Sequence, residues 1–134
     1  MTRTAHAPRP ISDAERDVLK RAFSVCATEA ATPAHLSAID SLIVASTCEC
    51  GCDTVEFAGR DAAPPPTPSI LADGLAEAPS GAAIGLIVFG TPDAITCLEV
   101  YSFDDEPARL PAVATIRPFE QAGGLSSNPS LERP

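Results

Sequence analysis

Three cysteines stand at alternate positions in the stretch TCECGC, so that Cys48, Cys50 and Cys52 offer three thiols within five residues. Thiolates bind zinc and other thiophilic metals, exchange disulfides and act as nucleophiles. An ordinary structural zinc site needs four ligands, so one more would have to come from elsewhere in the chain. The candidates for that fourth ligand are Cys26, Cys97, His35 or an acidic residue.

The single-residue spacing weighs against such a zinc site. In an extended chain the Cα atoms of Cys48 and Cys52 would lie about 13 Å apart, at a rise of roughly 3.3 Å per residue. Only a tight turn over residues 49–51 could bring the thiols together. A C-x-C disulfide is strained and therefore labile, and the more usual C-x-x-C redox motif in a βαβ context is absent. For nucleophilic catalysis, the one pairing worth naming is Cys52 with His35.

The interpretation that we favour for this stretch is structural. Reduced cysteine behaves as a small, readily buried hydrophobic residue, and Gly51 supplies the positive φ that a tight turn requires. The stretch is then a hairpin turn between two strands, and its thiols are packing residues. On this interpretation the chain carries no cofactor, and zinc held by the three cysteines is the alternative.

The clearest secondary-structure element is an amphipathic helix, predicted over residues 13–27. Ser12 and Glu15 have the spacing of a capping box, and apolar residues then recur at helical spacing. Strands are predicted at residues 41–47, 53–59, 69–78, 82–90 and 95–103. This order predicts an α+β fold, in which the N-terminal helix packs on an antiparallel sheet of about five strands in meander order.

Composition divides the chain into one domain and two tails. Residues 1–10 and 121–134 are rich in Pro, Gly, Ser and Thr and lack apolar periodicity, so we expect flexible tails there. Residues 11–120 are expected to form a single domain. Within it, residues 60–69 contain four prolines and are expected to form a surface loop.

The charge excludes several classes of function. Eighteen acidic residues against nine basic ones give a net charge of −9, which disfavours binding to nucleic acids and to anionic lipid. Such a charge would attract a basic partner. The most apolar run, residues 82–90, is about half as long as a membrane span. No secretory signal is apparent, so we expect a cytoplasmic protein whose five cysteines are free thiols.

Two segments carry a resemblance to other proteins. The pair formed by CECGCDTVEF and GAAIGLIVFGTPDAITCLEVYSFDDEPARLP resembles small bacterial proteins of unknown function that share a C-x-C-G-C turn and an L-E-x-Y-S strand. The resemblance covers roughly residues 42–111. It implies a bacterial, intracellular protein with a shared fold, and it implies neither an activity nor catalytic residues.

The sequence therefore predicts a non-enzymatic domain that binds another protein. Alternation in the strand at 95–103 places Glu99 and Tyr101 on one face together with Ile95, and an acidic corner follows the strand. The residues expected to contact the partner are Glu99, Tyr101, Asp104, Asp105 and Glu106. A basic toxin neutralised by an immunity-type protein would be one such partner. The alternative function is a metal- or redox-responsive protein that uses Cys48, Cys50 and Cys52, hereafter the cysteine cluster.

Overall fold

The computed structural model describes residues 3–58 and 67–119, and helix α1 (Asp13–Val25) lies where the sequence predicts a helix. The predicted capping box closes its first turn: Glu15 N donates to Ser12 Oγ at 3.1 Å, and Ser12 N donates to Glu15 Oε1 at 2.9 Å. The helix ends two residues before the predicted boundary. The chain beyond Val25 pairs with a sheet edge instead, because Asp73 N donates to Cys26 O at 3.2 Å.

In the described part of the chain, seven strands form one antiparallel sheet, in the order β1-β2-β3-β6-β5-β4-β7. The predicted α+β class and antiparallel sheet are confirmed, and the predicted number of about five strands is roughly right. The strands are β1 (Arg3–Pro10), β2 (Ile43–Cys48), β3 (Val55–Phe57), β4 (Ser69–Glu77), β5 (Ala83–Thr91), β6 (Ala94–Ser102) and β7 (Arg117–Pro118). Besides α1, the described residues form the helix α2 (Pro33–Ala38) and the short 3-10 helices η1 (Ile39–Ser41) and η2 (Val113–Thr115).

The predicted meander order is wrong at one point. Strands β2 and β3 form a hairpin, and β4, β5 and β6 follow one another as neighbours, but β3 pairs with β6 rather than with β4. Two strands, β6 and β5, therefore lie between β3 and β4. This arrangement brings the end of β6 next to the hairpin that carries the cysteine cluster. Of the predicted proline-rich loop, residues 60–66 lie outside the described part, and Ser69 already belongs to β4.

The structure differs from the predicted N-terminal tail over residues 1–10: Arg3–Pro10 forms the edge strand β1 and pairs with β2. The side chain of Arg9 shows how a segment with the composition of a tail is held in the fold. Arg9 donates from Nη1 to Glu15 Oε1 at 3.1 Å and from Nη2 to Glu15 Oε2 at 2.8 Å. The capping glutamate of α1 thus also holds the end of β1. The predicted C-terminal tail, residues 121–134, lies outside the described residues.

The Arg9–Glu15 ion pair makes the free energy of unfolding depend on pH. Burial alone would raise the pKa of Glu15, but hydrogen bonds from Arg9 and Ser12 and the charge of Arg9 outweigh it and hold that pKa below its usual value. Because the folded-state pKa is lowered, the stabilisation is present above the usual pKa of a glutamate and is lost as the pH falls through the lowered one. We expect Arg9→Met to be less stable than the wild type at pH 7, with the gap closing below about pH 4.

Urea unfolding of the two proteins at a series of pH values measures this gap, and Arg117→Met is the control, because Arg117 Nη1 donates to the backbone carbonyl of Thr115. A gap that stayed constant between pH 7 and pH 3 would contradict the role given to Glu15.

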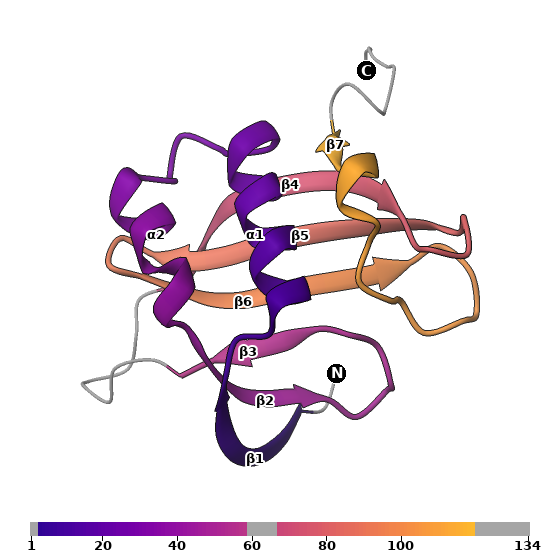
Figure 1. The fold of residues 1–134 in the computed structure, drawn as a ribbon, viewed down its shortest axis with the longest axis horizontal. Coiled ribbons are helices and arrows are strands. Elements are labelled where there is room, and N and C mark those ends of the chain that lie inside the picture. Colours follow the sequence, from indigo (N-terminus) through magenta and orange to yellow (C-terminus); the bar gives the residue numbers. More distant parts are fainter. Residues whose placement is uncertain (1–2, 59–66, 120–134) are drawn as a thin grey trace.

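The core lies between the sheet and its helical layer. Helices α1 and α2 lie on the same face of the sheet, in front of it in Figure 1. Leu19 of α1 and Leu86 and Leu98 of the central strands are completely buried in this layer. No helix in the described part of the chain is long and apolar enough to cross a membrane.

The opposite face of the sheet carries no helix from residues 3–58 and 67–119 and is hereafter called the helix-free face. Cys97 and Glu99 of β6 lie on it. A register irregularity opposite Phe89 and Gly90 shifts the alternation in this strand. As a result Ile95 joins the core cluster and does not share a face with Cys97 and Glu99, as the simple alternation predicted.

Candidate functional site

The cysteine cluster occupies the connection between β2 and β3, as the hairpin interpretation predicts. Cys48 is the last residue of β2, and the chain turns at Glu49 and Cys50. Gly51 has a φ of 94°, a backbone conformation that side chains disfavour, so a glycine is required there. Gly51 N donates to Cys48 O at 3.4 Å and closes the turn.

The turn gathers the three thiols instead of spreading them along an extended strand. Their Sγ atoms lie within 4.8 Å of one another, and Cys48 Sγ donates to Cys50 Sγ at 2.7 Å. Cys48 and Cys52 are buried, with 6% and 9% of their surface exposed, while Cys50 is exposed to solvent. Packing therefore accounts for two of the cysteines and leaves Cys50 unexplained by it.

Backbone amides also point at two of the sulfur atoms. Cys50 N donates to Cys48 Sγ at 3.3 Å, and Cys52 N donates to Cys50 Sγ at 3.4 Å. The hydrogen bond from the Cys48 thiol, followed by those from the thiol and backbone N–H of Cys52, lowers the pKa of Cys50 to about 7. Burial, followed by the contact with Cys50, raises the pKa of Cys48 to about 11. The cluster thus pairs an exposed cysteine that is about half ionised at pH 7 with a buried thiol that stays protonated.

The low pKa of Cys50 predicts fast alkylation in the metal-free protein. At pH 7 about half of a thiol with this pKa is thiolate, against about 1% for a thiol at the usual value of 9.0. The thiolate of a more acidic thiol is a weaker nucleophile, and over two pKa units this reduces the gain in rate by about eightfold. We therefore expect Cys48→Ala, which removes the main donor, to slow the reaction of Cys50 with iodoacetamide by up to about sixfold.

Mass spectrometry of the peptide that contains residue 50 measures the rate. Cys97→Ala is the control, because Cys97 is also buried but lies on the helix-free face. Equal rates in Cys48→Ala and in the wild type would contradict this explanation of the low pKa.

A distant segment, residues 107–110, holds the turn in place. Asp53 N donates to Ala108 O at 2.9 Å, and Leu110 N donates to Asp53 Oδ2 at 2.8 Å. Arg109 Nη1 donates to Gly51 O at 2.8 Å and lies 3.5 Å from Asp53 Oδ1. Sequence reasoning missed Asp53 and Arg109, since no local pattern connects residues that are 56 positions apart.

None of the named candidates for a fourth ligand joins the cluster in the described part of the chain. His35 is a buried residue of α2 and uses both ring nitrogens: Nδ1 accepts from Thr32 N at 3.1 Å, and Nε2 lies 2.7 Å from Thr91 O. The pairing of Cys52 with His35 as a nucleophile and its base is therefore not formed. Cys97 lies on the helix-free face, and Cys26 lies in the segment after α1.

The residues predicted to contact a partner lie along the end of β6. Tyr101 packs edge to face against Phe103, with 5.6 Å between the ring centroids, and Phe103 is 61% exposed. Asp104, Asp105 and Glu106 are exposed in the turn that follows. Ser102 Oγ fixes this turn, donating to Glu106 O at 2.7 Å and to Asp104 O at 3.1 Å.

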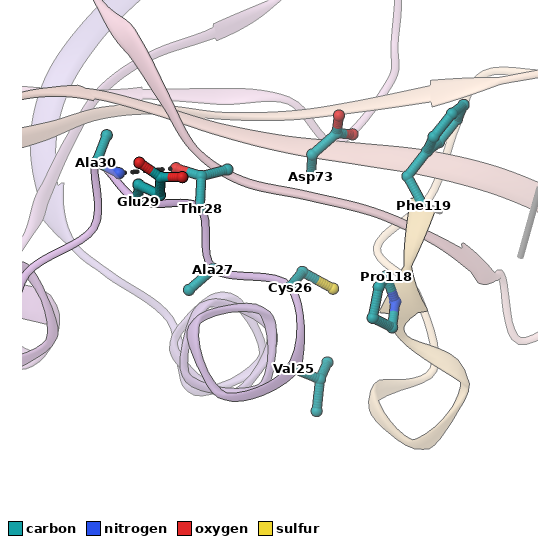
Figure 2. A pocket seen from close by; sticks show the side chains of 9 residues that line it. All are labelled: Val25, Cys26, Ala27, Thr28, Glu29, Ala30, Asp73, Pro118 and Phe119. Atoms are coloured by element: carbon teal, nitrogen blue, oxygen red, sulfur yellow. Dashed lines mark hydrogen bonds between the residues drawn. The ribbon is translucent and has the colours of Figure 1, made fainter. Parts of the chain in front are cut away.

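Two hollows lie away from the cluster. One, of about 350 Å³, lies on the helix-free face between Glu56, Phe89 and Glu99. The other, of about 640 Å³, is an open groove at the edge of β4, where Figure 2 shows Asp73 above the sulfur of Cys26 and Phe119 to one side. Burial raises the pKa of Cys26 to about 11, with the Asp73 charge adding to the effect, so this thiol is protonated at neutral pH. The groove therefore offers neither a thiolate ligand nor a nucleophile from Cys26.

Fold and site together define an α+β domain with one antiparallel sheet, helices on one face and a thiol cluster in a hairpin turn. Comparison of the chain with protein-family models, with curated proteins and with solved structures finds no match in any of the three. The resemblance to small bacterial proteins therefore stays a prediction, and the function has to be argued from the site.

Proposed function

We propose that this chain binds a thiophilic metal ion through Cys48, Cys50 and Cys52. The observation that carries the proposal is the convergence of the three Sγ atoms within 4.8 Å of one another. Sulfur ligands about 2.3 Å from one ion in tetrahedral geometry lie about 3.8 Å apart. The cluster is already close to that spacing, and the 2.7 Å contact between Cys48 and Cys50 has to open by only about 1 Å.

The surroundings of the thiols also suit a metal site. Backbone N–H groups donate to two of the sulfur atoms, and at Cys50 such a hydrogen bond helps to stabilise the thiolate, which is the form that binds metal. At Cys48 burial outweighs this effect, so a metal ion would have to displace the proton of that thiol. Hydrogen bonds from the segment at 107–110 hold the turn, as outer partners hold the ligands of metal sites. A bound ion would join the end of β2 to the start of β3.

Metal retention tests the proposal. Purified, reduced protein is loaded with Zn(II) and, separately, with Cu(I), passed through a desalting column, and analysed for metal by mass spectrometry. We expect one ion per chain to be retained in at least one of the two cases, and that retention to be lost in Cys50→Ser. Cys97→Ser is the matched control and should retain as much as the wild type. Loss of all metal from the wild type, or equal retention in Cys50→Ser, would refute the proposal.

A second candidate function is the binding of a basic protein, and one exposed aromatic residue favours it. Phe103 exposes 61% of its surface while it packs against Tyr101. Aromatic residues are enriched at protein interfaces. The three acidic residues of the following turn and Glu99 would add charge attraction to a basic surface.

A pulldown from a bacterial extract at physiological salt tests this second function. We expect the wild type to recover a basic protein that Phe103→Ser and the charge reversal Asp105→Lys do not recover. Ile70→Ser, at another exposed apolar residue, is the control. The same set of proteins on all four baits, or no protein on any, would count against a binding surface at Phe103.

A further inference from the structure

The cysteine cluster offers three sulfur atoms as metal ligands. Among residues 3–58 and 67–119, the group of potential ligands at this turn contains Cys48, Cys50 and Cys52 and no His, Asp or Glu. A structural zinc ion takes four protein ligands. Three thiolates therefore leave zinc one protein ligand short, but they complete the shell of an ion that prefers three.

The first acidic side chain after the cluster, Asp53, already interacts with the segment at 107–110. Asp53 follows Cys52 directly, but its Oδ2 accepts from Leu110 N at 2.8 Å and its Oδ1 faces Arg109 Nη1 at 3.5 Å. Turning this carboxylate toward the thiols would break both interactions and release the turn from the segment at 107–110. Asp53 is therefore a support of the turn and not a fourth ligand.

Glu49 is the one carboxylate within the turn itself. It stands between Cys48 and Cys50 and is exposed to solvent, outside the group of converging ligand atoms. A metal that demanded a fourth protein ligand would have to recruit this side chain, and substitution at this position reveals whether it does.

We infer that the cysteine cluster selects Cu(I), bound by three thiolates, over Zn(II). Thiolates are soft ligands that suit Cu(I), and a monovalent d¹⁰ ion is satisfied by three of them in a plane. Zn(II) on the same three thiolates would need water or Glu49 to complete a tetrahedron. The inference rests on the proposed function, because it names the ion for the same three thiols.

X-ray absorption on the reduced full-length chain tests the inference. The protein is loaded anaerobically with Cu(I), or with Zn(II), and passed through a desalting column before measurement. We expect one copper ion per chain with three sulfur neighbours and no oxygen or nitrogen, and zinc retention at least tenfold lower. Glu49→Gln should retain copper unchanged.

Two results would overturn the selectivity while leaving the proposed function intact. One is zinc retained at one ion per chain with a fourth protein ligand that disappears in Glu49→Gln. The other is zinc retained as fully as copper on three thiolates and a water molecule. Failure of the wild type to retain either ion would refute the proposed function, and the selectivity with it.

Discussion

Thr54→Val is expected to lower the free energy of unfolding by about 2–4 kcal/mol. Thr54 is completely buried where the hairpin enters β3, and its hydroxyl bridges both backbone groups of one β6 residue. Thr54 Oγ1 donates to Val100 O at 3.1 Å and accepts from Val100 N at 2.9 Å. Valine keeps the shape but leaves a buried N–H and a buried C=O without these partners, at about 1–2 kcal/mol each.

Urea and thermal unfolding measure the loss, which corresponds to a fall in Tm of roughly 8–16 °C for a domain of this size. Thr54→Ser keeps the hydroxyl and loses one methyl group, so it should cost much less. If Thr54→Val and Thr54→Ser were equally destabilised, the hydroxyl bridge would not be the source of the effect.

The parts of the fold that sequence predicts are those whose causes are local. The capping box at Ser12 and Glu15 fixes the start of α1, and the positive φ at Gly51 fixes the hairpin turn. Both depend on residues within four positions of one another. Strands β2 to β6 are recognised for the same reason, because an alternation or a run of apolar residues is a property of consecutive residues. Strands β1 and β7 are not recognised.

The parts that sequence missed depend on contacts between distant segments. Strand β1 has the composition of a tail, and it forms because β2 offers an edge and Glu15 offers Arg9 a buried partner. The order of β3, β6, β5 and β4 follows from tertiary packing, and a meander would satisfy the same local pattern.

The cysteine cluster stands between these two cases. The sequence predicts its turn, and it indicates that only a tight turn can bring the thiols together. Whether the side chains converge depends on rotamers, on backbone N–H donors and on the segment at 107–110, none of which the spacing of the cysteines specifies. Spacing in an extended chain is therefore a poor guide to metal-ligand geometry when a glycine turn interrupts the chain.

Arg109→Gln is expected to weaken Cu(I) binding by about tenfold, at the low end of the range for partners that hold metal ligands, because this guanidinium is 57% exposed. Arg109 donates to Gly51 O, between the second and third cysteine, so its loss lets the turn open and the ion has to gather the thiols itself. Competition with a chromophoric Cu(I) chelator at pH 7 measures the affinity.

Arg117→Gln is the charge-matched control: Arg117 lies on β7 at the far edge of the sheet, where it donates to Thr115 O. Because exposed hydrogen bonds and ion pairs such as those of Arg109 contribute little to global stability, the unfolding midpoint of the metal-free protein should change little in either variant. Equal affinities for Arg109→Gln and Arg117→Gln would mean that Arg109 contributes only its charge, and that the turn holds the thiols together without it.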